Sequence, residues 1–286
     1  MTAFFNHLNF EFRTGVRNKS LLLLNYLFPL GFYFLASTLL TGLNPTFNRT
    51  LIPAMIFFAI LTSTLLGLPE PIVSARESGI YRSYKIHGIP RLSILFIPVL
   101  TTVLHTTIVS IFIIISAPLL FNAVLPANAF GFVLGYLMMA FACAGLGLLI
   151  GVVSPNSRAT ILIGQAVFLP SMMIGGLMFP AQMLPATLGK LALLLPSNHA
   201  LNIVNGWVAG GTVTFNAYGS VVVLLVGGAL AFGLALYLFN WDSHNKVNRN
   251  PAIALLVLLP YILAVVVSLL TAAAGVSELA PRILEF

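Results

Sequence analysis

Charged residues are scarce in this sequence of 286 residues: Asp, Glu, Lys and Arg make up 7% of it, whereas a typical soluble domain has about 25%. Hydrophobic residues make up 59%. This number of charged side chains is too small to cover a hydrophobic core with a polar surface. The composition therefore excludes a soluble globular fold. The sequence therefore predicts a protein whose solvent is the lipid bilayer.

Cysteine is also nearly absent. The one cysteine, Cys143, lies inside an apolar stretch, which excludes a disulfide framework and a thiol metal cluster. No H-E-x-x-H motif and no cluster of carboxylates indicates metal or acid–base chemistry, and no G-x-x-x-x-G-K loop is present to cradle a nucleotide. We expect no catalytic residue, no bound metal and no cofactor in this chain.

The predicted membrane spans are helices separated by short polar turns. A span needs roughly 20 apolar residues. Seven runs reach or approach that length: about 20–42, 51–68, 92–121, 129–153, 159–178, 218–239 and 252–275. Residues 179–208 are apolar but interrupted by Pro180, Pro185 and Pro196, which favours short re-entrant helices on the outer side. The fold class is an all-α polytopic membrane protein with six to seven transmembrane helices.

None of these spans has Asp, Glu, Lys or Arg in its apolar interior. Ion-coupled transporters and proton pumps place such groups in mid-membrane. The absence indicates that the energy source lies outside the chain. His105 lies within a span, but a proton relay would need carboxylate partners that the spans lack, so we expect a structural role.

The first 18 residues predict an amphipathic helix in the interface plane. At 100° per residue its large apolar side chains share one arc and its polar ones lie opposite, with Phe10 alone on the polar side. The apolar arc holds Met1, Phe4, Phe5, Leu8, Phe12 and Val16. The sequence therefore divides into this helix (1–18), a body of six spans (19–240) and a polar loop with a further apolar run (241–286).

Basic residues gather at the span ends, as membrane topology requires, and not on a nucleic-acid-binding face. With the amino terminus inside, ten of the 13 are cytoplasmic: Arg13, Arg17, Lys19, Arg76, Arg82, Lys85, Arg91, Arg158, Lys246 and Arg249. Arg49, Lys190 and Arg282 are outside. This bias excludes a seven-span receptor, whose amino terminus would be external.

Residues 73–88, between the second and third spans, form the most informative polar segment. As one helix, this segment would align Val73, Glu77, Ile80 and Tyr84 in a stripe of mixed aromatic, apolar and acidic character. Such a helix suits docking into a groove of another protein. A solvated loop that only sets topology explains the same residues, and the segment alone does not choose between the two.

Several motifs resemble those of permease subunits of ATP-binding-cassette (ABC) type 2 exporters. Arg76-Glu77-x-Gly79 followed by Tyr81-Arg82 is similar to their E-R-E-x-G-T-x-x-x-L run, although Ala75 replaces the first acidic residue. The resemblance continues through Ser154 and 157–159, and is strongest at Gly-Gly-Leu-Met-Phe-Pro (175–180), Leu-Pro (184–185) and Leu-Pro-Ser-Asn-His-Ala (195–200). It covers about residues 1–240, and the family usually ends after six spans.

The resemblance implies a partnership with a separate ABC ATPase subunit, which would bind ATP and Mg, and with a second copy or a paralogous permease. The implied ATPase-coupling residues are Arg76, Glu77, Gly79, Ile80, Tyr81, Arg82, Tyr84, Phe10 and Arg13. The expected substrate path uses Asn25, Phe28, Phe32, Phe57, Gln165, Phe168 and Met172 from the first, second and fifth spans. Helix packing would explain these path residues as well.

The expected function is export of a hydrophobic or amphipathic substrate from the cytoplasm or inner leaflet. The expected location is the plasma membrane of a bacterium or archaeon, with lipids as further partners and no nucleic acid. A membrane scaffold or assembly protein that transports nothing is the alternative. A neighbouring gene for an ABC ATPase would favour the exporter.

Overall fold

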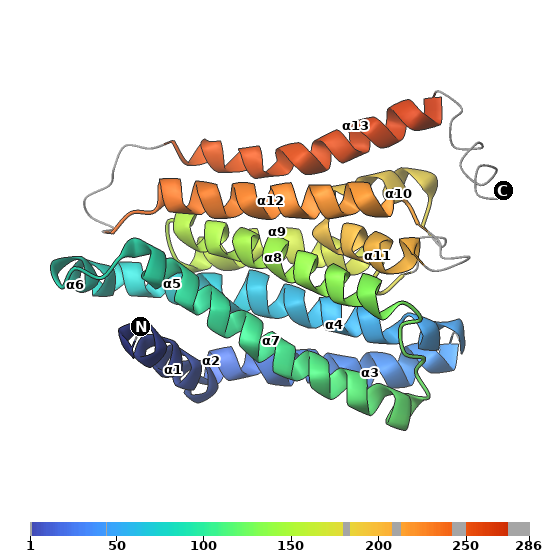
Figure 1. The fold of residues 1–286 in the computed structure, drawn as a ribbon, viewed down its shortest axis with the longest axis horizontal. Helices are drawn as coiled ribbons and strands as arrows, with labels where there is room; N and C mark the ends of the chain where they lie inside the picture. The colour runs from blue at the N-terminus through green and yellow to red at the C-terminus, as the bar shows by residue number, and fades with distance from the viewer. Residues whose placement is uncertain (1, 44, 180–183, 208–212, 242–249, 274–286) are drawn as a thin grey trace.

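The computed structural model describes residues 2–43, 45–179, 184–207, 213–241 and 250–273. These residues form an elongated bundle of helices, and no strand occurs among them (Figure 1). Six helices in the described ranges are long and apolar enough to cross a membrane: Lys19–Leu40, Leu51–Glu77, Arg91–Phe121, Ala129–Val153, Ala217–Leu238 and Pro251–Thr271. The predicted all-α membrane fold is confirmed.

Each of the first two spans contains a π-helical turn. The first runs through α2 (Lys19–Leu22), η1 (Leu23–Leu27) and α3 (Phe28–Leu43). The second runs through α4 (Leu51–Leu61), η3 (Thr62–Gly67) and α5 (Pro69–Glu77). The turns η1 and η3 pack against each other. Such π-helical turns inside α-helices often mark functional sites.

The second span lies at the centre of the bundle. All residues of α4 are buried, and α4 packs on α3, α7 (Arg91–Phe121), α8 (Ala129–Val153) and α11 (Pro196–Gly206). Close approach explains Gly147 on α8, because a Cβ there would lie 1.9 Å from the Thr64 carbonyl oxygen. Gly147 of α8 therefore serves close helix packing against the second span.

Helix α9 (Ser157–Met173) is shorter than the expected fifth span. Its 17 residues reach about 26 Å, below the roughly 30 Å of hydrocarbon. The helix ends at Met173, shortly after Pro170, and Gly176 then adopts a left-handed conformation at φ 92°. The expected helix to residue 178 was therefore too long, because Pro170 and the two glycines after it favour an early end.

The segment after α9 holds short helices: α10 (Ala186–Leu191), η5 (Ala192–Leu194) and α11 (Pro196–Gly206). Helix α11 is largely buried against α8 and α12 (Ala217–Leu238). His199 bonds to the Leu193 carbonyl oxygen at 2.9 Å and to Ser220 Oγ at 3.1 Å. These contacts satisfy the polar groups that the short helices bring into the bundle.

The last apolar run forms η6 (Pro251–Leu258) and α13 (Leu259–Ala273), which lie along α12 at one side of the bundle (Figure 1). Tyr261 is 1% exposed, and its ring fits against the bare backbone at Gly227 of α12. Most of the opposite face is exposed and apolar. The run is long and apolar enough to be a further span.

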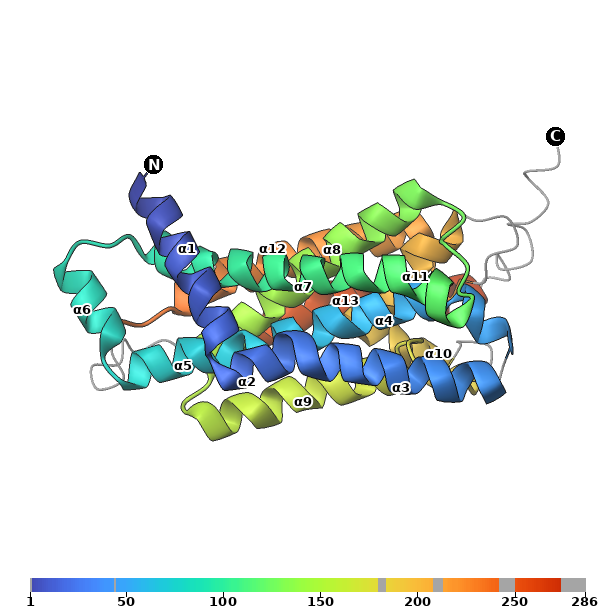
Figure 2. The same cartoon turned by 90° about the horizontal axis from the view of Figure 1, so that it is seen from below.

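The two ends of the bundle differ in charge. Helices α1 (Thr2–Arg17), α5 and α6 (Ile80–Ile86) lie at one end, with η2 (Pro45–Arg49) and α10 at the other (Figures 1 and 2). Helices α1 and α6 and the first residues of α7 and α9 carry the basic residues of the first end: Arg13, Arg17, Arg82, Lys85, Arg91 and Arg158. The far end carries Arg49 and Lys190. Among the described residues, the fold therefore gathers most basic side chains at one end, as the charge pattern predicts; Lys246, Arg249 and Arg282 lie outside the described residues.

Candidate functional site

The predicted coupling segment forms two helices instead of one. Helix α5 ends at Glu77, and α6 begins at Ile80. Gly79 between them has φ 77°, a left-handed conformation that favours glycine. The predicted single stripe from Val73 to Tyr84 is therefore wrong, because the chain turns at Gly79. The resulting α5–α6 hairpin extends beyond the rest of the bundle (Figure 1).

Arg76 points inward from this hairpin. Its side chain is 9% exposed, and it donates to the carbonyl oxygen of Val152, at 2.6 Å, and to that of Ser154. These carbonyls lie at the end of α8. Arg76 is thus bound within the chain and not on a surface where another subunit could reach it.

Tyr81 also lies inside. It is 4% exposed, and its ring lies 5.5 Å from that of Phe239 after α12. Burial raises the pKa of its hydroxyl. In this fold the Tyr81 ring anchors α6 to the bundle and is not presented on the outer surface of the hairpin. Its predicted part in ATPase coupling stays a prediction.

The outward surface of the hairpin combines apolar and basic side chains. Ile86 is 77% exposed and Ile80 is 44% exposed. Glu77, Arg82, Lys85 and His87 are exposed beside them, while Tyr84 is partly buried. Large apolar side chains held in water at a charged end are typical of a protein-binding surface.

Helix α1 contacts the hairpin through His7. The His7 ring meets Tyr84 edge-on at 6.1 Å, and His7 Nε2 lies 3.7 Å from Glu11 Oε1. Burial raises the pKa of the Glu11 carboxyl, an effect that His7 partly offsets. The predicted coupling residues on this helix, Phe10 (62% exposed) and Arg13, both lie on its surface.

The other end of α1 is fixed on the third span. Phe12 stacks on the ring of His105 with centroids 4.3 Å apart, and His105 Nδ1 lies 2.6 Å from Tyr26 Oη. A Cβ on Gly15 would lie 2.5 Å from His105 Nε2. His105 thus joins α1, the first span and α7, which matches the expected structural role.

An aromatic cluster, formed by Phe28, Phe32, Phe58 and Phe168, joins the first, second and fifth predicted spans. Phe58 is its centre: its ring lies 4.1 Å from Phe32 in a stacked arrangement, and 5.7 Å from both Phe28 and Phe168. Phe28 is 40% exposed at its edge. Three of these residues were predicted from the sequence, and Phe58 was missed.

Phe57, the predicted path residue on α4, lies apart from this cluster. It is fully buried, and its ring approaches Gly135 of α8. Gln165 is exposed on α9 and Met172 is partly buried there.

Asn25, the predicted path residue in η1, is 3% exposed, and its Oδ1 lies 3.0 Å from the position of a Cβ on Gly67 of η3. The two π-helical turns therefore meet at a buried amide, whose Oδ1 has no hydrogen-bond partner in the described chain.

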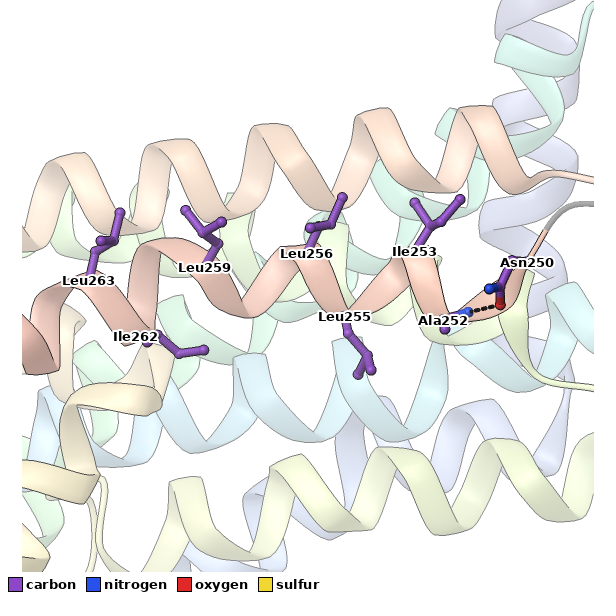
Figure 3. A pocket seen from close by; sticks show the side chains of 8 residues that line it. All are labelled: Asn250, Ala252, Ile253, Leu255, Leu256, Leu259, Ile262 and Leu263. Atoms are coloured by element: carbon purple, nitrogen blue, oxygen red, sulfur yellow. Dashed lines mark hydrogen bonds between the residues drawn. The ribbon is translucent and has the colours of Figure 1, made fainter.

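An apolar groove of about 560 Å³ runs along η6 and α13 (Figure 3). Its lining is one polar residue, Asn250, followed by Ala252, Ile253, Leu255, Leu256, Leu259, Ile262 and Leu263. Asn250 Oδ1 accepts from the Ala252 amide, which caps η6. The lining suits lipid chains and carries no group for chemistry. Among the described residues, no three His, Cys, Asp or Glu side chains group as metal ligands.

The fold thus has an amphipathic first helix, a protruding hairpin and short helices at the far end of the bundle. The sequence also matches a known protein family. The model of the ABC-2 type transporter membrane domain matches residues 2–208. This chain belongs to that family. The match covers α1 to α11 and leaves α12 and α13 outside. No curated protein and no solved structure matches the sequence.

Membership gives the broad role. An ABC-2 membrane domain is the transmembrane permease component of an ABC transporter, and the family implies partnership with an ABC ATPase subunit. The domain itself is generally non-catalytic. The chain is therefore a multi-pass membrane protein that functions in transport.

Proposed function

We propose that this permease exports a hydrophobic or amphipathic substrate from the cytoplasm or inner leaflet, driven by ATP hydrolysis in a separate subunit. The sequence has no phosphate-binding loop of its own, so ATP and Mg bind in that partner. The α5–α6 end faces the cytoplasm, because the basic residues gather there. The location is the plasma membrane of a bacterium or archaeon.

The observation that carries this proposal is the exposed surface of the α5–α6 hairpin. Ile80 and Ile86 project from it among Arg82 and Lys85. A lone permease gains nothing from two exposed isoleucines in water, since burying each is favourable by roughly 1.5–3 kcal/mol. A groove on the ATPase subunit accommodates the isoleucines, and acidic groups around it match the basic side chains.

A second permease subunit completes the path in this proposal. Next to the aromatic cluster, α3 and α9 present exposed apolar side chains, among them Leu35 (56%), Leu39 (57%) and Leu162 (69%). Two such faces would enclose a path lined by the aromatic cluster, Met172 and Gln165. Apolar walls favour lipid-like or drug-like cargo, and rocking of the two halves would expose the path to each side in turn.

Site-specific photo-crosslinking tests the docking surface. A photoreactive residue at Ile86 should crosslink, in cells, to a protein that binds ATP and carries a phosphate-binding loop. The matched control is Leu119 on α7, which is equally exposed at 77% but lies near the other end of the bundle. Crosslinks to the ATPase from Leu119 and none from Ile86 would contradict the proposal.

A further inference from the structure

We propose that Arg76 is a positioning residue that joins the α5–α6 hairpin to the turn between α8 and α9, so that a movement of the hairpin moves α9. The inference rests on the proposed function, since it assigns a path to the motion that ATP hydrolysis would start. It also gives Arg76 a role different from direct contact with the ATPase.

The bonding of the guanidinium group carries the first step. Its two terminal nitrogens donate separately to the carbonyl oxygens of Val152 and Ser154, and the side chain is 9% exposed. Among the described residues, no carboxylate lies within ion-pair distance of it, and the carboxylate of Glu77 attracts it only from farther away. A buried cation normally needs a compensating charge. Here the compensating groups are backbone carbonyls.

The end of α8 supplies the missing negative charge. The last carbonyls of an α-helix lack partners within the helix and carry the negative end of its dipole, equivalent to about half an elementary charge. Helix α8 is 25 residues long and ends at Val153. The planar fork of arginine bonds the two carbonyls from two separate nitrogens in a fixed geometry, which the single, freely rotating ammonium of a lysine does not reproduce. The contact therefore holds α5 to the end of α8 in one geometry.

Further contacts join α5 to α8 and to the start of α9. A Cβ on Gly151 of α8 would lie 3.0 Å from the Pro69 carbonyl oxygen, so α5 and α8 meet almost backbone to backbone. Beyond Ser154, the Ser157 hydroxyl donates to Glu77 Oε2 at 3.4 Å, and Asn156 caps α9 through the Ala159 amide. The turn of residues 154–157 is thus bound at its first residue by Arg76 and at its last by Glu77, two consecutive residues of α5.

Helix α9 carries the motion to the aromatic cluster. Phe168 lies on α9, and its ring is 5.7 Å from Phe58. A displacement of the hairpin is therefore transmitted from Arg76 to the turn, along α9, and to the cluster that lines the proposed path. Loss of Arg76 should leave ATP hydrolysis in place and separate it from transport.

The test compares transport per ATP hydrolysed in vesicles that hold the permease with its ATPase. Arg76→Met should keep the Ile86 crosslink and ATP hydrolysis but lower transport per ATP at least tenfold. Arg76→Lys keeps the charge and loses the planar fork, so its transport per ATP should lie between those of the wild type and Arg76→Met. The control Ser220→Ala removes a buried hydrogen bond between Ser220 and His199, which involves neither α5 nor α9, and should leave the ratio unchanged.

A covalent bridge between α5 and the start of α9 tests whether Arg76 transmits movement or only stabilises the fold. In the Arg76→Met background, cysteines at Glu77 and Ser157 joined by a short bifunctional thiol reagent should restore transport per ATP; the same chain without the reagent should not. If the wild-type complex transports while both Arg76 variants keep the full ratio, or the bridge restores nothing, the inference is overturned. A wild-type complex without ATP-driven transport would instead contradict the proposed function.

Discussion

Phe32 and Phe58 stack with their ring centroids 4.1 Å apart, so the first and second spans meet through nearly parallel rings. Phe58 touches two further aromatic rings of the cluster, whereas its neighbour Phe57 faces α8. Adjacent residues of one helix therefore serve different surfaces. This difference supplies a matched pair of variants.

We expect Phe58→Leu to change substrate transport more than Phe57→Leu does. Both side chains are fully buried, so the two changes should cost similar stability, about 1–3 kcal/mol. Only the first removes the ring that joins Phe28, Phe32 and Phe168. The measurement is transport of a panel of aromatic and aliphatic substrates, normalised to the amount of folded permease. Equal profiles for the two variants would exclude the cluster from the path.

Gly15→Ala should release α1 from the third span. The added methyl group would lie 2.5 Å from His105 Nε2, and His105 cannot easily yield because Phe12 and Tyr26 hold its ring. Overpacking of this kind typically costs 1–3 kcal/mol. Trypsin should then cleave faster at Arg13 and Arg17. Gly31→Ala, where nothing lies within 4 Å, is the control and should cleave like the wild type.

Glu11 should make the docking of α1 depend on pH. Burial raises its pKa in the folded chain above the usual 4.5, so folding favours the protonated carboxyl. The contribution is therefore fully present below pH 4.5 and is lost as pH rises through the raised value. Spin labels at Asn9 and Leu92 should report increasing separation over that window. Glu11→Gln should abolish the change, and a pH-dependent separation that persists in this variant would contradict the assignment to Glu11.

The membrane topology can be checked with three exposed positions. Cysteines at His87 and Asn250 should react with an impermeant thiol reagent from the same side, and one at Thr187 in α10 from the opposite side. The cytoplasmic side should be that of His87. Reaction of His87 and Thr187 from one side would contradict the assignment of the two ends.

The sequence predicts the helices of this fold well because the constraints on them are local. The fourth span was expected at 129–153, and α8 has those bounds, since Asn128 caps its start and Ser154-Pro155 follow its end. The seventh apolar run is likewise helical. Length and apolar composition decide such elements before any tertiary contact forms.

The direction in which each side chain points, and therefore its partners, is harder to predict from the sequence. Every residue of α4 is apolar, so its periodicity gives no face and cannot separate Phe57 from Phe58. The inward turn of Arg76 and Tyr81 depends on the break at Gly79 and on partners about 80 and 160 residues further along the chain. No local pattern encodes those distant contacts. A Gly after a short charged helix is the one signal that could have indicated the break.

Reconstitution in vesicles most directly tests the central claim, that this chain is a permease driven by a separate ABC ATPase. Vesicles containing this chain and its ABC ATPase should move a fluorescent amphipathic substrate across the membrane when ATP and Mg are supplied. Vesicles containing either protein alone should not, and the isolated chain should neither bind nor hydrolyse ATP. ATP-driven transport by the chain alone, or none by the assembled complex with an active ATPase, would contradict the account.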